Sequence, residues 1–424
     1  MKRKQLLFVI SLIFIPIIFF GNDSPYGINA HSGSNEILAK VKETGMKWIR
    51  VDLYWSIIEK EKGKFDYGEI DRIVKYSREN QLTILGVLSS SPGWSNNNKG
   101  RNYPPDNTEN WRNFVSVTAS RYKEDIRYWN IWNEPNVKKF FAPGKDIFVD
   151  EIFIPAAEVI RKNSPLSLIA GPELAHLVNQ GSEWYFWMKY ILTECSEYID
   201  IVSHHIYKNT GVYAIFESLE IGENITPSVK EIIDESGFSS VPFWITETGW
   251  DTELFSEEEQ GNRYLEFLQE MKKRNYPDKI FFYKIMDDAT SEIRPWGILK
   301  SDFTEKPAYG IYTDYISGLY PAEENTEPEE FSKKCYMEEN VSRSGLKNKT
   351  RVLANLRKAR DFARIFPFMD NFISLYYRSG SILKKIAVNI PVFRKYSLDA
   401  AAVIDYIFET RSLEFSGFLA GLTP

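Results

Sequence analysis

The feature that most constrains the fold is a regular alternation of strand-like and helix-like segments between about residue 24 and residue 320. Eight apolar runs read as strands: YGINA, KWIRVDLYW, LTILGVLSS, IRYWNIW, LSLIAGPE, IDIVSHHIY, VPFWITETGW and KIFFYKIMDD. Most are continuously apolar, as parallel strands covered on both faces are. Repeated strand–helix units of this kind predict an α/β fold, a (β/α)₈ barrel.

The segments between these runs carry helix signals. EILAKVKETG places Ile37, Leu38 and Val41 on one helical face and ends at Gly45, a residue type that commonly follows a helix. TPSVKEIIDESG places Pro227 at a helix start. A doubly wound open sheet is the competing fold, but it usually has a glycine-rich phosphate loop after its first strand. Here HSGSNE follows the first strand, which favours the barrel.

The amino-terminal segment, residues 1–22, has the pattern of an export signal. MKRKQ is basic, the run from Leu6 to Phe20 is apolar, and polar GNDSP follows. The run is shorter than the ~20 residues that usually span a membrane. We therefore expect an exported, extracytoplasmic protein, with an uncleaved membrane anchor as the alternative.

The carboxy-terminal segment, residues 321–424, differs in charge from the predicted barrel of residues 23–320. From Glu330 onward there are 16 Lys and Arg against 9 Asp and Glu, a net charge of +7, whereas the preceding residues have 36 against 49, a net of −13. An acidic linker is followed by basic, helix-like stretches of unknown role. We favour an ordinary packed helical extension, and a basic helix on a membrane surface is the alternative.

Composition argues against several classes of function. The net charge of −6 argues against a nucleic-acid partner for the whole chain. Cys195 and Cys335 are the only cysteines, and neither they nor the four histidines have metal-ligand spacing. We therefore predict no metal and no cofactor. Aromatic residues make up 15% of the chain, which suits either a large core or the flat faces of sugars.

Two carboxylates stand at predicted strand ends. In a (β/α)₈ barrel the carboxyl ends of all strands share one rim, where catalytic residues lie. Glu134 follows the fourth strand and Glu247 lies near the end of the seventh. Hydrolysis of a glycosidic bond needs such a pair, one residue protonating the leaving oxygen and the other attacking the anomeric carbon or activating water.

Neighbouring polar residues could support this pair. Asn133 can bond a sugar 2-hydroxyl. His205 and Tyr207 alternate along the sixth strand and so point the same way, where they could hold Glu247 ionised. Arg50, on the second strand, would add positive charge. Each residue alone has an ordinary structural explanation, but together they fall on the strand ends of one predicted barrel.

Aromatic side chains also stand at predicted strand ends. Trp94 follows the third strand and Trp250 the seventh, where both could line a sugar-binding rim. Tyr283 lies on the eighth strand. Rim packing is the alternative for the two tryptophans.

WNIWNEPN and FWITETGW resemble the acid/base and nucleophile signatures of retaining glycoside hydrolases of clan A, closest to families 39 and 5. HHIY is similar to the clan's His-x-Tyr on strand six, and WGILKSDFTEKPAYGIY to its closing turn and last helix. The resemblance spans about residues 24–320. It implies Glu134 as acid/base and Glu247 as nucleophile, supported by four further residues: Asn133, Arg50, His205 and Tyr207. Many family 5 enzymes have a Trp at the end of strand eight, where the nearest aromatic here is Tyr283.

We therefore expect a retaining glycosidase that hydrolyses β-linked O-glycosidic bonds of a poly- or oligosaccharide without a cofactor. A non-catalytic glycan-binding barrel in polysaccharide assembly or export is one alternative. A transglycosylase, which would share every named residue, is another. The sequence leaves open the sugar, the linkage, endo or exo action and the oligomeric state.

Overall fold

The computed structural model describes residues 24–31, 33–222, 226–290 and 293–320. The predicted export segment at 1–22 and the predicted extension at 321–424, with Cys335, lie outside the described residues. Their assignments therefore stay predictions.

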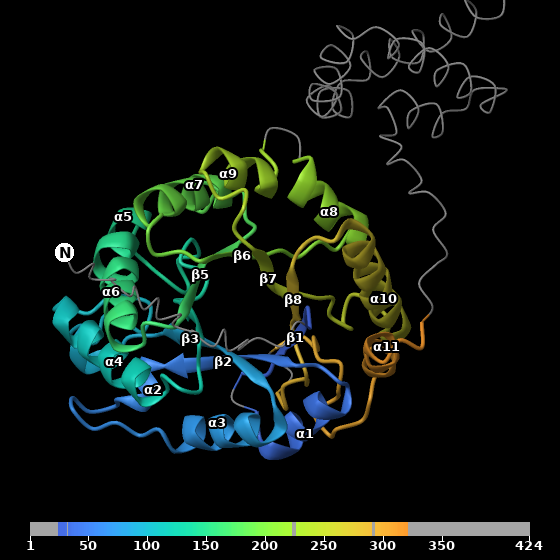
Figure 1. Cartoon of the computed structure of the whole chain (residues 1–424), viewed down its shortest axis with the longest axis horizontal. Coiled ribbons are helices and arrows are strands. Elements are labelled where there is room, and N and C mark those ends of the chain that lie inside the picture. The colour runs from blue at the N-terminus through green and yellow to red at the C-terminus, as the bar shows by residue number, and fades with distance from the viewer. Residues whose placement is uncertain (1–23, 32, 223–225, 291–292, 321–424) are drawn as a thin grey trace, which may run out of the picture.

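The eight strands form a closed barrel in chain order, and each strand pairs in parallel with the next (Figure 1). The barrel closes where β1 pairs with β8. This confirms the predicted (β/α)₈ fold. The strands are β1 (Tyr26–Asn29), β2 (Trp48–Tyr54), β3 (Thr83–Ser89), β4 (Tyr128–Ile131), β5 (Leu168–Ala175), β6 (Ile201–His205), β7 (Phe243–Thr248) and β8 (Lys279–Phe282).

Helices surround the strands as an outer ring (Figure 1). They are α1 (Asn35–Glu43), α2 (Trp55–Ile58), α3 (Gly68–Asn80), η1 (Gly93–Ser95), α4 (Thr108–Arg121), α5 (Lys145–Phe148), η2 (Val149–Phe153), α6 (Ile154–Asn163), α7 (Trp184–Glu194), α8 (Val212–Glu220), α9 (Val229–Glu235), α10 (Glu257–Arg274) and α11 (Pro307–Ile316).

Side-chain caps fix several helix starts. The Ser34 hydroxyl accepts a hydrogen bond from the Ile37 backbone N–H at the start of α1. At α10, Ser256 and Glu259 form a reciprocal capping box. Ser228 caps α9, so the helix predicted in TPSVKEIIDESG is present and begins two residues after Pro227. A serine oxygen can satisfy a free backbone N–H, and proline has no comparable acceptor on its side chain.

An aromatic layer fills the barrel interior near the amino ends of the strands. Trp48, Tyr128, Trp244 and Phe281 pack there, with ring centroids 4.7 Å to 6.2 Å apart. Side chains two positions further along a strand point the same way, one layer closer to the carboxyl rim. Arg50 is two positions after Trp48 on β2, so its side chain lies inside the barrel, one layer above the aromatic side chains and closer to the open end.

Most of the tryptophans belong to the core. Of the 11 tryptophans in the chain, seven have a relative exposure below 2%. They are Trp48, Trp55, Trp111, Trp129, Trp132, Trp184 and Trp250. Cys195 is also buried, and burial raises the pKa of its thiol to about 12, so it behaves as a small core residue.

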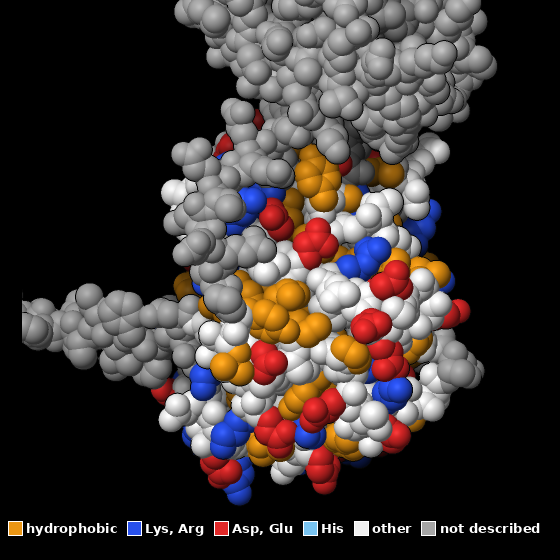
Figure 2. Space-filling view, turned by 90° about the vertical axis from the view of Figure 1, so that its right-hand side faces the viewer, with side chains coloured by type: hydrophobic (Ala, Val, Ile, Leu, Met, Phe, Trp, Pro, Cys, Tyr) orange, Lys and Arg blue, Asp and Glu red, His pale blue; other side chains and the backbone are white. Residues whose placement is uncertain are grey.

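The described part of the surface is mixed in character. In the face that Figure 2 shows, acidic and basic side chains are interspersed with scattered hydrophobic ones. Among the described helices there is none with the length and apolar character needed to cross a bilayer.

Candidate active site

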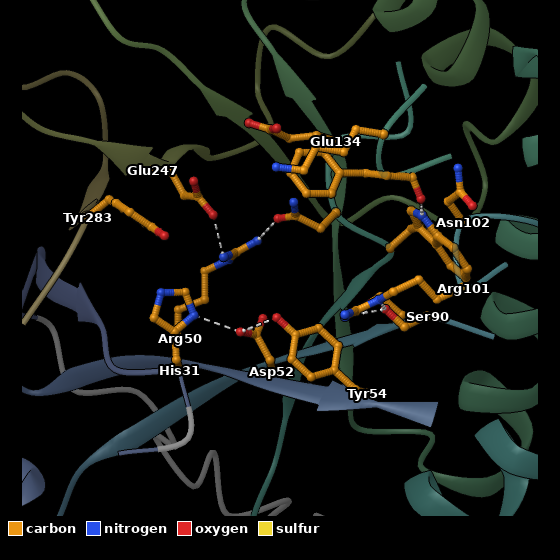
Figure 3. A pocket seen from close by; sticks show the side chains of 15 residues that line it. His31, Arg50, Asp52, Tyr54, Ser90, Arg101, Asn102, Glu134, Glu247 and Tyr283 are labelled. Carbon is orange, nitrogen blue, oxygen red and sulfur yellow. Dashed lines mark hydrogen bonds and ion pairs between the residues drawn. The ribbon is translucent and has the colours of Figure 1, made fainter. Parts of the chain in front are cut away.

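A cavity of about 330 Å³ opens among the carboxyl ends of the strands (Figure 3). Its walls come mainly from β2, from the ends of β3 and β4, and from loops that follow them. It is lined by His31, Arg50, Asp52, Tyr54, Ser89, Ser90, Arg101, Asn102, Trp132, Asn133, Glu134, Lys139, Phe140, Glu247 and Tyr283. Five of the nine residues that the sequence singles out lie in this lining: Glu134, Glu247, Asn133, Arg50 and Tyr283.

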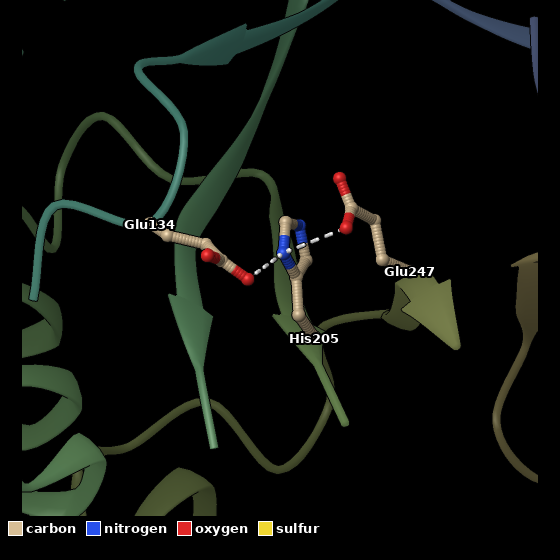
Figure 4. Close-up of side chains that lie close together, drawn as sticks. All are labelled: Glu134, His205 and Glu247. Atoms are coloured by element: carbon tan, nitrogen blue, oxygen red, sulfur yellow. Dashed lines mark hydrogen bonds and ion pairs between the residues drawn. The ribbon is translucent and has the colours of Figure 1, made fainter. Parts of the chain in front are cut away.

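Glu134, three residues after the end of β4, and Glu247, on β7, converge at this cavity. One oxygen of each carboxylate and a ring nitrogen of His205 all lie within 4.8 Å of one another (Figure 4). His205 Nδ1 is 2.9 Å from Glu134 Oε1 and 3.6 Å from Glu247 Oε2. The side chains of Glu134 and Glu247 are only 14% and 11% exposed. Two nearly buried carboxylates therefore face one small volume.

Strong donors hold both oxygens of Glu247. Arg50 Nη1 donates to Oε1 at 2.7 Å (Figure 3), and the Tyr207 hydroxyl donates to Oε2 at 2.8 Å. Charge-assisted bonds of this kind stabilise the ionised form and fix the orientation of the carboxylate. Burial, followed by the charge of Glu247, raises the pKa of Tyr207 well above its usual value, so Tyr207 remains a donor.

Arg50 also connects the pair to Asn133. Arg50 Nη2 donates to Asn133 Oδ1 at 2.8 Å. The amide oxygen is used in this way, and the amide nitrogen of Asn133, which lines the cavity, has no partner among the described residues. Arg50 thus lies beside Glu247, where the sequence places its positive charge, whereas the bond from Asn133 to a sugar 2-hydroxyl stays a prediction.

A third carboxylate, Glu173, lies beneath the pair and was missed by the sequence analysis. Its side chain is fully buried, and Oε2 accepts from Arg50 Nη2 at 2.9 Å and lies 3.0 Å from His205 Nε2. Thr246 Oγ1 donates to Oε1 at 2.7 Å. Burial acts to raise the pKa of Glu173, but the charges of Arg50 and His205 outweigh it and lower the pKa to about 2. Glu173 is therefore a permanent anion that anchors both cations.

The position of Glu173 in the sequence could have revealed it. The fifth predicted strand, LSLIAGPE, ends in this glutamate, just as Glu134 and Glu247 stand at the ends of the fourth and seventh strands. Strict alternation of side chains along the strand, however, would point Glu173 away from the barrel interior. The β5–β6 register shifts between Pro172 and Leu174, which makes Glu173 the extra residue of a bulge. Its φ of 58° is left-handed, an uncommon conformation for a residue other than glycine. The bulge turns the side chain inward.

His205 bridges the carboxylates as an imidazolium. Burial acts to lower its pKa, but the charges of Glu247 and Glu173 and the hydrogen bonds to Glu134 and Glu173 raise the pKa to about 10. In that form both ring nitrogens donate, Nδ1 to Glu134 and Nε2 to Glu173. His205 therefore links the acid/base candidate to the buried anion.

The raised pKa of His205 predicts a pH dependence of stability. Its folded-state pKa of about 10 exceeds its ordinary value of 6.5, so its contribution is complete below pH 6.5 and is lost as the pH rises through 10. Between pH 6 and pH 9 the wild type should lose on the order of 3 kcal/mol of unfolding free energy more than His205→Asn does. Urea unfolding of both proteins at the two pH values measures this difference. Equal losses in the two proteins would contradict the assignment of the proton to His205.

The WNEPN motif forms a turn after β4 whose backbone conformation orients Glu134. Trp132 and Glu134 have left-handed φ values of 71° and 45°. Such strain persists where surrounding contacts impose it, often at functional sites. The Glu134 N–H donates to the Glu173 carbonyl at 2.9 Å. The buried Asn136 amide bonds both the N–H and the carbonyl of Ala175. The turn that aims Glu134 is thus fastened to β5.

Two predicted rim aromatics do not line the cavity. Trp250 is 1% exposed, its indole N–H donates to the Lys208 carbonyl, and its ring packs against Tyr264. This corrects its prediction as a sugar contact, because the chain after β7 turns the ring into the core. Trp94 is half-buried, donates to the Glu59 carbonyl at 2.7 Å and packs edge-on against Trp55, and its role as a sugar contact stays a prediction. The alternative of rim packing therefore fits both residues.

The three clustered groups Glu134, His205 and Glu247 could in geometry ligate a cation. Their contacts favour another explanation. Arg50 and Tyr207 already occupy the oxygens of Glu247, and the two nitrogens of His205 face carboxylates. Positive charge at this site is thus supplied by side chains, and an added divalent cation would meet the charges of Arg50 and His205.

Comparisons with known proteins agree with this geometry. The chain spans a quarter of the length of a curated β-xylosidase from Caldicellulosiruptor saccharolyticus, to which it is 30% identical over 129 residues, 29% of this chain. The structure of a family 39 glycoside hydrolase from Bacteroides cellulosilyticus WH2 is 18% identical with a TM-score of 0.54, covering 70% of this chain and 64% of that one. A monomeric β-xylosidase from Caulobacter crescentus CB15 is 17% identical with a TM-score of 0.55, covering 69% and 67%.

At these identities the solved structures show the shared barrel fold alone. The family evidence comes from the sequence model of the glycosyl hydrolases family 39, which matches residues 33–259, more than half of the 424-residue chain. The matched range contains both converging carboxylates and the residues that hold them. The chain belongs to glycoside hydrolase family 39.

Proposed function

We propose that this barrel is a retaining β-glycosidase in which Glu247 is the nucleophile and Glu134 the acid/base. The observation that supports it best is the approach of the two carboxylates, whose nearest oxygens lie within 4.8 Å. Retaining enzymes hold their carboxyl groups about 5–5.5 Å apart, whereas inverting enzymes need about 6.5–9.5 Å to admit a water between them.

In the first step a Glu247 oxygen attacks the anomeric carbon of the sugar. The bond to the leaving oxygen breaks, and Glu134 gives that oxygen its proton. The product is a glycosyl-enzyme ester on Glu247 and a free leaving alcohol. In the second step Glu134 takes a proton from water, the resulting hydroxide attacks the anomeric carbon, and the Glu247 carboxylate is released. Two displacements leave the anomeric configuration unchanged.

The donors to Glu247 act in both steps. Arg50 and Tyr207 donate to the two carboxylate oxygens and orient them before attack. They also stabilise the negative charge that returns to Glu247 when the ester breaks. Because Arg50 is 2% exposed and fixed by Glu173, it holds this position without rearrangement.

The double displacement requires Glu134 to carry a proton when Glu247 attacks and to have lost it when water enters. Arg50 and His205 supply positive charge at the site, and Glu173 and Glu247 supply negative charge. Formation of the ester on Glu247 removes one of these negative charges before Glu134 has to act as the base.

Asn133 fits the role of a donor to the sugar 2-hydroxyl. Asn133 lines the cavity, and Arg50 holds its amide oxygen, which leaves the amide nitrogen as the group that would donate to the sugar. Contacts to the 2-hydroxyl that strengthen in the transition state contribute several kcal/mol in glycosidases. Tyr283 lines the same cavity and could provide an aromatic wall where many family 5 enzymes have a tryptophan.

The β-xylosidase relatives make aryl β-xylosides the first substrates to test. With a substrate that the wild type cleaves, proton NMR identifies the anomer formed before mutarotation. We expect the β-anomer first. If the α-anomer is the first product, the enzyme inverts, and Glu247 is not a covalent nucleophile.

We also propose that the protein is exported, which the basic start and the apolar run at Leu6 to Phe20 support. Residues 1–22 would then be a signal peptide or an anchor. A polysaccharide outside the cytoplasm would be the corresponding substrate.

A further inference from the structure

The cavity continues beyond the catalytic pair along one face of β2. Arg50, Asp52 and Tyr54 are two residues apart in turn, so their side chains point to the same side of the strand, and all three line the cavity. Asp52 is 8% exposed. It is absent from the mechanism above, although a nearly buried carboxylate in a substrate cavity needs a physical explanation.

The two oxygens of Asp52 differ in their partners. Oδ2 lies 2.7 Å from His31 Nδ1 and accepts from the Tyr54 hydroxyl at 2.9 Å (Figure 3). Oδ1 has no hydrogen-bond partner among the residues that the structure describes. Buried polar atoms in folded proteins are normally satisfied. Two neighbours therefore orient Asp52 so that its remaining acceptor is left for something in the cavity.

The ionisation of Asp52 suits an acceptor. Burial acts to raise its pKa, but the hydrogen bond from His31 and the charges of His31 and Arg50 lower the pKa to about 2. The group is thus a carboxylate at neutral pH. Hydrogen bonds to a charged acceptor are stronger than those to a neutral one.

A donor faces the same part of the cavity. The Arg101 guanidinium carbon lies 5.0 Å from the centre of the Tyr54 ring, and Arg101 Nη2 donates to Ser90 Oγ at 3.1 Å. Within the described part of the chain Arg101 has no carboxylate partner. The ring and the hydroxyl hold the guanidinium beside the cavity with N–H groups to spare. Tyr54 therefore contacts both a carboxylate with a free acceptor and a guanidinium with free donors.

We propose that this part of the cavity is a sugar subsite that selects a neutral ring with two adjacent free hydroxyls, one donating to Asp52 Oδ1 and the other accepting from Arg101. The proposal rests on the proposed function for the class of ligand, a glycoside. Asp52 is then a specificity-determining residue, and His31 and Tyr54 are positioning residues. The hydroxyls are other than the 2-hydroxyl, which Asn133 serves.

The charges favour a neutral sugar over an acidic one. A uronate carboxylate placed against the free oxygen of Asp52 would be repelled by it, although Arg101 and Lys139 also line the cavity and would attract an anion elsewhere in it. A vicinal diol offers one donor and one acceptor and matches both groups. A hydroxyl that is acylated or otherwise substituted cannot donate to Asp52 and would be rejected.

A double-mutant cycle between protein and substrate tests the contact. The substrate is whichever the wild type cleaves fastest of the 4-nitrophenyl β-D-xyloside, β-D-glucoside and β-D-mannoside, together with its 3-deoxy and 4-deoxy analogues. In the wild type one deoxy analogue should lose roughly 10- to 100-fold in kcat/KM. In Asp52→Asn the same deletion should cost less than about threefold, because the two changes remove one interaction.

Asp302→Asn is the matched control. Asp302 is an exposed aspartate whose side chain bonds the Thr304 N–H, and it should show the full wild-type loss. The wild type should also cleave 4-nitrophenyl β-D-glucuronide at least about tenfold more slowly than the glucoside. In Asp52→Asn the ratio of these two rates should be smaller. Equal deoxy losses in wild type and Asp52→Asn at both positions would overturn the proposal.

A binding arm separates this proposal from the proposed function. The same neutral glycosides are titrated by calorimetry into Glu247→Gln, with and without Asp52→Asn. Should no glycoside turn over while Asp52→Asn weakens binding about tenfold or more, the hydrolase assignment fails and the subsite stands. If binding is indifferent to Asp52→Asn, or if no neutral glycoside binds, the subsite is refuted.

Discussion

Replacing Glu247 with glutamine is expected to lower turnover of every glycoside substrate by roughly 10⁴-fold or more, because a neutral amide cannot form the glycosyl ester. The amide keeps the size of the carboxylate. Arg50 retains its ion pair with the buried Glu173, so the barrel should remain folded. The measurement is kcat for aryl β-glycosides, with circular dichroism and melting temperature as checks on the fold.

Glu258→Gln supplies the control for this variant. Glu258 lies on the exposed face of α10, and its replacement should leave kcat unchanged. Turnover by Glu247→Gln at a tenth of the wild-type rate or better would remove Glu247 from the role of nucleophile. A comparable collapse in Glu258→Gln would point instead to a general loss of folding.

Replacing Glu134 with alanine should give a different kinetic pattern. Loss of the proton donor should slow cleavage of natural glycans by roughly 10²- to 10⁴-fold. An aryl glycoside with a good leaving group needs little protonation, so Glu247 should still attack it. Hydrolysis of the ester then lacks its base, and the aryl alcohol should appear as a burst equal to the enzyme concentration.

Azide provides the decisive readout for Glu134→Ala. The small anion can enter the space left by the side chain and attack the anomeric carbon without a base. Turnover should rise with azide, and the product should be the β-glycosyl azide. An α-glycosyl azide would indicate direct displacement on the substrate. A variant that shows neither a burst nor any response to azide would contradict the acid/base role.

The barrel and the placement of the two glutamates follow from the sequence because they depend on local patterns. Continuous apolar runs fix the strands, and the shared carboxyl rim of a parallel barrel then brings polar strand ends together. Glu134 and Glu247 meet for this reason, although they are remote in the chain. The same reasoning places Arg50, His205 and Tyr207 beside them, as the structure shows.

The residues that the sequence reasoning missed depend on breaks in strand periodicity. Ala170 points into the barrel, so strict alternation would turn Glu173 outward towards the helices. The bulge at Glu173 reverses that direction. A similar shift between Ile245 and Thr248 in β7 lets Thr246 and Glu247 both face inward. A β-bulge is a tertiary compromise between neighbouring strands, and the local residue pattern does not specify it.

Side chains beyond a strand end are equally hard to place. Trp250 stands only two residues after β7, yet the loop directs it into the core against Tyr264. Asp52, by contrast, could have been placed from the sequence. It lies within a strand on the same face as Arg50, and extending the alternation by one step from Arg50 would have placed it in the cavity. The direction of a side chain in a loop depends on tertiary packing, whereas the direction of Asp52 follows from the two-residue alternation of side chains along a strand.

The most direct test of the account is the covalent intermediate itself. In a 2-deoxy-2-fluoro-β-glycoside the fluorine slows both the formation and the hydrolysis of the ester. A good leaving group speeds formation alone, so the ester should accumulate. Proteolysis and mass spectrometry of the inactivated wild type should find one fluorosugar on the peptide that contains FWITETGW, attached at Glu247. Labelling of Glu134 or Glu173 instead, or hydrolysis of the reagent without any adduct, would contradict the double-displacement mechanism.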